Sequence, residues 1–378
     1  MTCPPHLARA KLNNTSSISR HGFLHAGARR RVWDCTPLGF ELPIFWLHVE
    51  TLAGVVDHFL AAESTTTHTT DRRKPLLLTE AISGGRIPPR ISHVNITAVV
   101  VDFDVERQRF CRGLQGGNIV KCMENLQRFK LVEKLIDMAA TDDLALFGDV
   151  DEIARPSVVS MLSQCNPFAG LHAPPYYILT LTLFKYGVHC DHGNAFNLGT
   201  RLFGMRHLQL EYGHYRTANP AVLATMSASF TATRLATRQP IIREAGWHLT
   251  SFGEPWELKR KLNTWLHANM FKGWQIDVDQ LERCMRFCLD LLDRSKRHPA
   301  LCASRDDPQS VRLPGRVVER IEQADLPPPL VAYTSDYPAS WMRYLRSHGA
   351  ATGRLTGRGS PSTTHDTSWL RRAVFPVA

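Results

Sequence analysis

Apolar and polar positions alternate in blocks through the middle of the chain, and the blocks predict buried strands joined by helices. Residues 144–147 form an apolar run with the length and composition of a buried strand. Residues 119–140 carry apolar side chains at helical spacing, which predicts a helix with one broad apolar face. Because this helix leads through a short polar turn into the buried strand, the two make one half of a βαβ unit.

Other segments repeat the division into strands and helices. We expect strands over residues 32–36, 55–62, 95–103 and 176–184, and helices over residues 156–162, 256–271 and 278–292. Residues 40–52 are largely apolar, and their pattern does not distinguish a helix from a strand. The sequence therefore predicts an α/β fold.

An acidic cluster directly follows the buried strand. Asp149 and Asp151 are two residues apart, so an extended backbone would place both side chains on one face. Ligands bind just outside the carboxyl ends of the strands in open α/β sheets. Two carboxylates at such a place suit a hard divalent cation that also holds phosphate oxygens. The simpler alternative is a helix start near Pro156, where acidic side chains cap free N–H groups.

The net charge of +10 comes mainly from the two ends of the chain. Residues 1–31 hold six Lys and Arg and no acidic residue, and residues 351–378 hold four Arg and one Asp. Residues 32–350 therefore carry only +1, which argues against a nucleic-acid-binding face. We expect a basic, disordered or targeting tail over 1–31, a single domain over 32–330, and an extension with a disordered basic tail over 331–378.

Several motifs bear on the compartment of the protein. The chain has no apolar run of about 18 residues, so we expect no membrane-spanning helix. Its nine cysteines include no Cys-x-x-Cys pair, which argues against a zinc ribbon, and disulfides are expected only in an oxidising lumen. Asn95-Ile96-Thr97 is a glycosylation sequon, as are overlapping triplets at Asn13 and Asn14. These sequons can be used only if the chain enters a secretory lumen. The segment 189–192 holds good zinc ligands, although a polar loop is the default interpretation.

Four blocks of residues occur in order through the predicted domain. They are Trp33–Cys35 with Phe40–Pro43; Val55–Phe59 and Ala62–Ser64 with Lys74–Leu76; Asp149–Ile153; and Ala245–His248 followed by Lys261, Leu262 and His267. In this order they resemble glycosyltransferase family 17. The third block is weak alone and becomes specific only in the company of the others.

The resemblance implies a fold and an activity. The fold is an A-type, nucleotide-sugar-binding α/β fold with a mixed, mostly parallel sheet flanked by helices, its donor half at about 32–165 and its acceptor half at about 166–330. The implied activity is that of a β-1,4-mannosyl-glycoprotein 4-β-N-acetylglucosaminyltransferase. Such an enzyme moves N-acetylglucosamine from UDP-N-acetylglucosamine to a mannose of an N-glycan core, with inversion at the anomeric carbon. The implied location is the Golgi or another endomembrane lumen. The chain shows no anchor or clear signal peptide, which predicts a soluble or truncated protein.

The resemblance also implies roles for individual residues. Asp149 and Asp151 take the positions that bind a divalent metal, Mn²⁺ or Mg²⁺. An inverting transfer needs a base for the acceptor hydroxyl, and we take Glu152 and Glu244 as candidates. The predicted donor- and acceptor-binding residues are Glu63, Ser64, Trp247, His248, Lys261 and His267. Each of these has a plain structural alternative, such as a strand-end cap, a core tryptophan or a packed histidine.

Two departures from the family pattern leave other functions open. Leu249 stands where the family has Cys, and Asn269 stands where an acidic residue is usual. One alternative is therefore a catalytically silent glycan-binding protein of the same fold. Another is a metal-dependent hydrolase that uses the acidic cluster together with the histidine-rich segment near residue 190.

Overall fold

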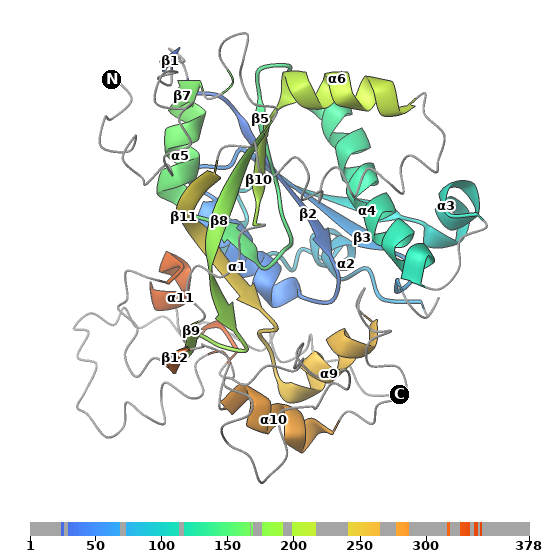
Figure 1. The fold of residues 1–378 in the computed structure, drawn as a ribbon, viewed down its shortest axis with the longest axis vertical. Coiled ribbons are helices and arrows are strands. Elements are labelled where there is room, and N and C mark those ends of the chain that lie inside the picture. Colours follow the sequence, from blue (N-terminus) through green and yellow to red (C-terminus); the bar gives the residue numbers. More distant parts are fainter. Residues whose placement is uncertain are drawn as a thin grey trace.

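The computed structural model describes residues 24–25, 29–68, 73–112, 117–166, 168, 176–191, 199–216, 241–264, 277–286, 316–317, 326–332, 336–338 and 341. In this part of the chain, a large mixed sheet is flanked by helices (Figure 1). Its order is β12-β9-β8-β10-β5-β2-β3-β4, and β11 pairs with both β8 and β6. The predicted fold class is therefore confirmed.

The elements have the following bounds. The strands are β1 (Leu24–His25), β2 (Val32–Leu38), β3 (His58–Ser64), β4 (Ile96–Val101), β5 (Leu144–Phe147), β6 (Glu152–Ala154), β7 (Cys165–Asn166), β8 (Tyr176–Lys185), β9 (Cys190–Asp191), β10 (Arg201–Gly204), β11 (Ile241–Thr250) and β12 (Arg316–Val317). The helices are α1 (Leu42–Leu52), α2 (Leu77–Ser83), the 3₁₀ helix η3 (Pro89–Ile91), α3 (Phe103–Phe110), α4 (Gly117–Met138), α5 (Pro156–Gln164), α6 (Met205–Arg216), α9 (Pro255–Thr264), α10 (Val278–Arg286) and α11 (Pro328–Ala332).

Most of the predicted elements are present, with shifted ends. The long helix predicted over 119–140 is α4, and the ambiguous segment 40–52 is helix α1, which has a proline in its first turn. The strand predicted over 55–62 begins only at His58. Residues 55 and 56 instead follow α1 in a turn, where their N–H groups donate to the carbonyl of Leu52.

The parallel part of the sheet reverses its strand order beside β2. The chain passes from β2 to β3 and then to β4 on one side, and β5 lies on the other side of β2. All three of these ladders are parallel, with Cys35 opposite both Leu60 and Phe147. The loops that follow β2 and β5 therefore leave neighbouring strands at a switch point in the strand order, and open α/β sheets bind ligands at such a point.

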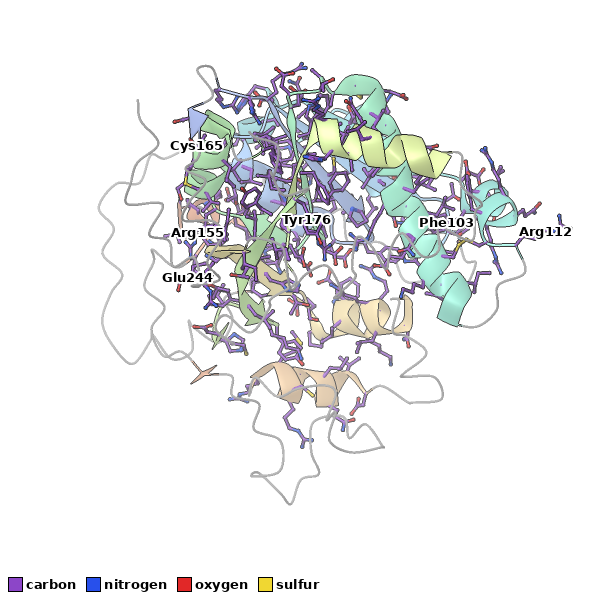
Figure 2. The ribbon with its side chains drawn as sticks, turned by 45° about the horizontal axis from the view of Figure 1, so that its top comes forward. Phe103, Arg112, Arg155, Cys165, Tyr176 and Glu244 are labelled. Atoms are coloured by element: carbon purple, nitrogen blue, oxygen red, sulfur yellow. A yellow bond between two sulfur atoms is a disulfide. The ribbon has the colours of Figure 1, made fainter. Side chains whose placement is uncertain are left out.

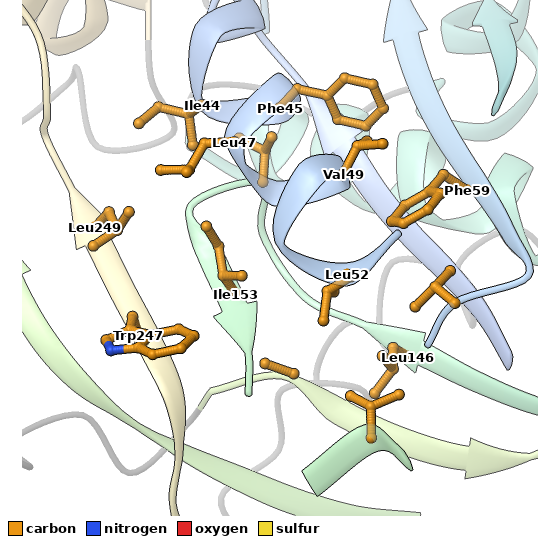
Figure 3. Close-up of a cluster of buried hydrophobic side chains, with 14 of the residues drawn as sticks. Ile44, Phe45, Leu47, Val49, Leu52, Phe59, Leu146, Ile153, Trp247 and Leu249 are labelled. Carbon is orange, nitrogen blue, oxygen red and sulfur yellow. The ribbon is translucent and has the colours of Figure 1, made fainter. Parts of the chain in front are cut away.

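Two hydrophobic clusters cover the two faces of this sheet. One cluster joins α1 to the sheet, and Figure 3 shows Leu47 of α1 near Ile153 and Leu249. The other joins α4 to the sheet, with Leu126 and Leu135 among its buried side chains. Strands that are covered on both faces are apolar at consecutive positions, which explains the unbroken apolar run of β5.

The second part of the sheet brings a late segment of the chain beside β6. Strand β10 is antiparallel to both β5 and β8, and β11 is parallel to β8. Strand β11 also runs antiparallel to β6, with His248 opposite Glu152. This pairing carries the fourth sequence block to the end of β5, although almost one hundred residues separate the two in the chain.

The ends of the predicted domain are only partly described. Within the predicted tail 1–31, β1 pairs with β7, and Arg29 and Arg31 form ion pairs with Asp57 and Asp143. The rest of that tail and most of the extension 331–378 lie outside the described residues, and the domain boundaries stay predictions. None of the described helices combines the length and apolar character needed to cross a bilayer.

A substitution at Gly246 would test how tightly β11 packs against β6. A Cβ atom on Gly246 would lie 2.2 Å from the carbonyl oxygen of Ile153, whereas one on Gly54 would have no neighbour within 4 Å. We expect Gly246→Ala to lower the free energy of unfolding by about 1–3 kcal/mol. The control Gly54→Ala should change it by less than about 0.5 kcal/mol. Urea unfolding of the two variants measures this, and equal stabilities would contradict the described contact.

Candidate functional site

The candidate site lies where the loops after β2 and β5 meet. Helix α9 lies beyond the carboxyl ends of the parallel strands (Figure 1). Its Lys261 amino group is 3.3 Å from Glu41 Oε1, in the loop after β2, and 3.4 Å from Asp151 Oδ2, in the loop after β5. The neighbouring Arg260 guanidinium lies 4.5 Å from the ring centre of Phe40. Helix α9 is therefore tied to both of these loops.

The acidic segment after β5 is a tight turn. The N–H of Glu152 donates to the carbonyl of Asp149 at 2.9 Å, and the N–H of Asp149 donates to Glu152 Oε2 at 3.1 Å. A Cβ atom on Gly148 would lie 2.6 Å from Thr200 Oγ1, so only glycine fits at the start of this turn. Glu152 thus closes the turn with its side chain as well as with its backbone.

Asp149 and Asp151 contact different cationic side chains. Asp149 Oδ1 is 2.5 Å from Arg128 Nη2, and the Asp149 side chain is 48% exposed. The Asp151 side chain is only 9% exposed, with Oδ1 3.5 Å from His248 Nε2 and Oδ2 3.4 Å from Lys261 Nζ. The two carboxylates are therefore neutralised separately, by α4 on one side and by β11 and α9 on the other.

The pairing around Asp151 shifts the pKa values of all three partners. Burial would raise the pKa of Asp151, but the charges of Lys261 and His248 outweigh it and hold the pKa well below its ordinary value. Burial would lower the pKa of Lys261 and of His248, and the Asp151 carboxylate raises both above their ordinary values. The pairing therefore favours the charged form of all three side chains.

Glu152 is the carboxyl group with the opposite shift. Its side chain is buried, and this burial together with the charge of Asp149 raises the pKa of Glu152 to about 7. A carboxyl group with a pKa near neutrality can both accept and release a proton at working pH. Glu152 therefore has the acid–base chemistry that the sequence assigned to it as a candidate.

Basic side chains surround the acidic turn. Arg201 begins β10 opposite Phe147, so it stands at the same edge of the sheet as the turn. Burial lowers the pKa of Arg201, while the charge of Glu152 opposes that shift. Together with Arg128 and Lys261 it gives this edge three basic groups, which are the side chains that bind phosphate oxygens in proteins.

The predicted Mn²⁺ or Mg²⁺ ion does not fit the side chains as they stand. Both oxygens of Asp151 face cations, and Asp149 is paired with Arg128. Over the described ranges, no group of three or more His, Cys, Asp and Glu side chains is arranged to hold a metal. The ion stays a prediction, and its binding would require Lys261, His248 or Arg128 to give up a partner.

Two of the predicted binding residues serve as strand-end caps. The Glu63 carboxylate accepts hydrogen bonds from the N–H groups of Leu78 and Thr79, each at 2.9 Å, at the start of α2. The Ser64 hydroxyl donates to the carbonyl of Thr66 at 2.8 Å. Both side chains are buried and make these structural hydrogen bonds, and their roles in binding stay predictions.

Three other predicted residues lie away from the acidic turn or outside the description. Trp247 is 2% exposed in the core, with the Arg155 guanidinium 4.4 Å from its ring centre. Glu244 is exposed in the bulge of β11 beside Arg155, whose Nε donates to its carbonyl at 3.0 Å (Figure 2). His267 lies outside the described residues.

The segment near residue 190 is not a zinc site as described. Cys190 is disulfide-bonded, and His189 is buried with Nε2 2.9 Å from the carbonyl oxygen of Met285. A disulfide sulfur is not a thiolate and cannot serve as a zinc ligand of the usual kind. His192 lies outside the described residues.

The structure adds members that the sequence did not single out. Arg128 stands on the polar face of the predicted long helix, where nothing distinguishes it from other exposed basic residues. Glu41 belongs to the first sequence block, so its place in the site had a signal. Arg201 had none, because β10 was not predicted.

One protein-family model matches more than half of the chain. The model of glycosyltransferase family 17 matches residues 2–230. No curated protein matches the chain. Among solved structures, mannose-6-phosphate isomerase from Helicobacter pylori shares 12% identity, with 56% of this chain and 85% of that chain covered and a TM-score of 0.27. A mycobacterial protein shares 11% identity, with 61% and 70% covered and a TM-score of 0.31. TM-scores this low carry no argument about the fold or the function.

The raised pKa of Glu152 predicts a pH dependence of stability. A carboxyl group whose pKa rises from 4.5 to about 7 on folding contributes stability below pH 4.5 that is lost as the pH rises through 7. Glu152→Gln should remove this loss, so the melting temperature of the variant relative to the parent should rise between pH 4.5 and 7. Glu244→Gln is the control and should track the parent. Parallel curves for all three proteins would contradict the described burial of Glu152.

Proposed function

This chain belongs to glycosyltransferase family 17, and from that premise we propose that it transfers N-acetylglucosamine from UDP-N-acetylglucosamine to a mannose of an N-glycan core. The product is a β-1,4 linkage, formed with inversion at the anomeric carbon. The observation that carries the proposal is the pair of contacts from Lys261 to Glu41 and Asp151. A basic group that contacts both loops at the switch point would meet a nucleoside diphosphate bound there.

Arg128, Arg201 and Lys261 provide the charge that the leaving group needs. When the sugar leaves UDP, the departing phosphate oxygen gains negative charge, and donors fixed in advance stabilise that charge most effectively. All three side chains are held at the edge of the sheet by carboxylates of the site or by strand pairing. Diphosphate binding would exchange part of these ion pairs for contacts with phosphate oxygens.

We assign the base to Glu152 rather than to Glu244. The acceptor hydroxyl must lose a proton as the new bond forms, and a base works best with a pKa near the working pH. Burial gives Glu152 such a pKa, about 7, and Glu152 adjoins the aspartates of the turn. Glu244 is exposed in the bulge of β11, at the other end of the contacts that join β11 to β6.

The metal requirement is a separate question from the transfer itself. The family resemblance implies Mn²⁺ or Mg²⁺, whose role would be to neutralise the diphosphate. Arg128, Arg201 and Lys261 lie at the same edge of the sheet and carry the same sign of charge, which supports a transfer without a metal as the other possibility. Turnover measured with and without EDTA distinguishes the two, because chelation abolishes a metal-dependent transfer and leaves a reaction supported by Arg128, Arg201 and Lys261 unchanged.

The disulfides support a location in an oxidising lumen such as the Golgi. Cys111 and Cys122 form a disulfide between the end of α3 and α4, and Cys165, Cys190 and Cys284 are also disulfide-bonded. Disulfides persist in secretory compartments and are rare in the cytosol. This agrees with a glycoprotein acceptor, which is processed in the same compartments.

The two alternatives gain no support from the described residues. Leu249, one of the departures behind the silent-protein alternative, is buried in the core, and its N–H donates to the Asp151 carbonyl at 2.8 Å. Because a cysteine would make the same backbone bond, this departure leaves the turn intact. Asn269 lies outside the described residues. The hydrolase alternative needed ligands near residue 190, where Cys190 is disulfide-bonded.

Lys261 gives the sharpest test of the proposed site. We expect Lys261→Met to lower kcat for UDP release by roughly 10²-fold or more, because it removes a fixed donor from the leaving group. Lys259→Met lies on the same helix and is the matched control, with near-parental activity expected. The assay uses UDP-N-acetylglucosamine and a core N-glycan. Failure of the parent to turn over any sugar nucleotide would overturn the function, and an equally active Lys261→Met variant would overturn the site.

A further inference from the structure

Asn95 of the glycosylation sequon is exposed at the start of an edge strand. It immediately precedes β4, the last strand on one side of the described sheet. Its backbone carbonyl accepts a hydrogen bond from the Phe59 N–H at 2.9 Å, which fixes the main chain. Its side-chain Nδ2 donates to the carbonyl of Asp57 at 3.2 Å, at the surface. The amide has two N–H groups, so one remains for Asp57 when the other is replaced.

The position of Asn95 keeps a glycan away from the candidate site. Strands β2, β3 and β4 are parallel, so Asn95 lies at the amino edge and the acidic turn lies near the carboxyl edge. Six residues of β4 separate the two edges by about 20 Å. A glycan there would also flank an exposed edge strand, whose Val100 is 45% exposed, and would hinder edge-to-edge pairing with other chains.

We propose that Asn95 is a site of N-linked glycosylation. The Asn95 amide nitrogen attacks the anomeric carbon of a lipid-linked oligosaccharide diphosphate, forms the C–N bond, releases the lipid diphosphate and loses one proton. The proposal rests on the disulfides that indicate a secretory lumen and on the exposure of the sequon. It does not depend on the transferase activity of the chain.

The test is to produce the full chain behind a secretion signal in eukaryotic cells. Peptide mass spectrometry after N-glycanase treatment should find Asn95 converted to Asp, and Asn95→Gln and Thr97→Ala should each remove this modification. Asn95→Gln should keep parental transferase activity. A secreted, disulfide-bonded chain with unmodified Asn95, or with a glycan at Asn13 or Asn14 alone, would overturn the proposal.

A second and independent observation concerns His48, which is buried beneath the acidic turn. Its Nδ1 is 2.9 Å from the carbonyl oxygen of Val150, and its Nε2 is 3.1 Å from Asp34 Oδ2. A carbonyl and a carboxylate are both acceptors, so both ring nitrogens must donate and the ring carries a positive charge. Burial alone would lower the pKa of His48. The charge of Asp34 and the two hydrogen bonds outweigh burial, so the pKa lies above its ordinary value.

We infer that the Asp34–His48 pair positions the acidic turn for sugar transfer. Val150 lies between the two aspartates, so a fixed Val150 carbonyl sets the path of the backbone that carries them. The contact joins β2, α1 and the turn through one ring, and all of its members are buried. His48 is a positioning residue and does not touch substrate. This inference rests on the proposed function.

Two amide substitutions separate the two contacts of His48. Asparagine places its amide nitrogen near the position of Nδ1, and glutamine places it near that of Nε2. We expect His48→Asn to keep most of kcat, because it can still donate to Val150, and His48→Gln to lose roughly tenfold or more through misplacement of the turn. The Michaelis constant for the donor should change less than kcat does.

The control measurements separate this inference from its premise. Melting temperatures and UDP binding by calorimetry are measured for both variants and for the parent. Equal kcat losses in the two variants, or losses that only follow the folded fraction, would show a merely structural role. An inactive parent that is folded would instead refute the proposed function, and unequal UDP affinities of the variants would then still support the positioning of the turn.

Discussion

The contacts of Lys261 with Glu41 and Asp151 hold together the part of the molecule that gives it a site. The two carboxylates come from the loops that follow the neighbouring strands β2 and β5. A single ammonium group from α9 contacts both of them and so joins the two loops. Its side chain is half-buried, so the pairing is screened less by water than a fully exposed ion pair would be.

The same cluster shows how the carboxylates after β5 are balanced by ion pairs. Three acidic residues in four positions would repel one another strongly if they were left without counter-charges. Arg128, His248 and Lys261 supply these charges from three separate elements, and Glu152 avoids part of the repulsion by favouring its neutral form. The arrangement is therefore electrically balanced by the polypeptide alone, and any cationic ligand has to compete with it.

The sequence predicted the local parts of this site better than its assembly. Periodicity identified β5 and α4, because a buried strand and a long amphipathic helix have strong patterns. The acidic turn was found because it directly follows an apolar run. Arg201 was missed because β10 is short, and the roles of Glu63 and Trp247 depend on α2 and on Arg155, whose contacts no local pattern reveals. Long-range pairing decided each of these cases.

The placement of β11 has a consequence for biosynthesis. This strand fills the space between β8 and β6, yet it is made about sixty residues after β8 ends. If β6 and β8 fold before those residues are made, their hydrogen-bonding groups toward β11 are unpaired, and the acidic turn lacks His248 and Lys261. Such an intermediate is prone to pair with other chains. The interval in which chaperone protection would matter most therefore lasts until residue 261 has been made, because Lys261 is the later of the two counter-ions.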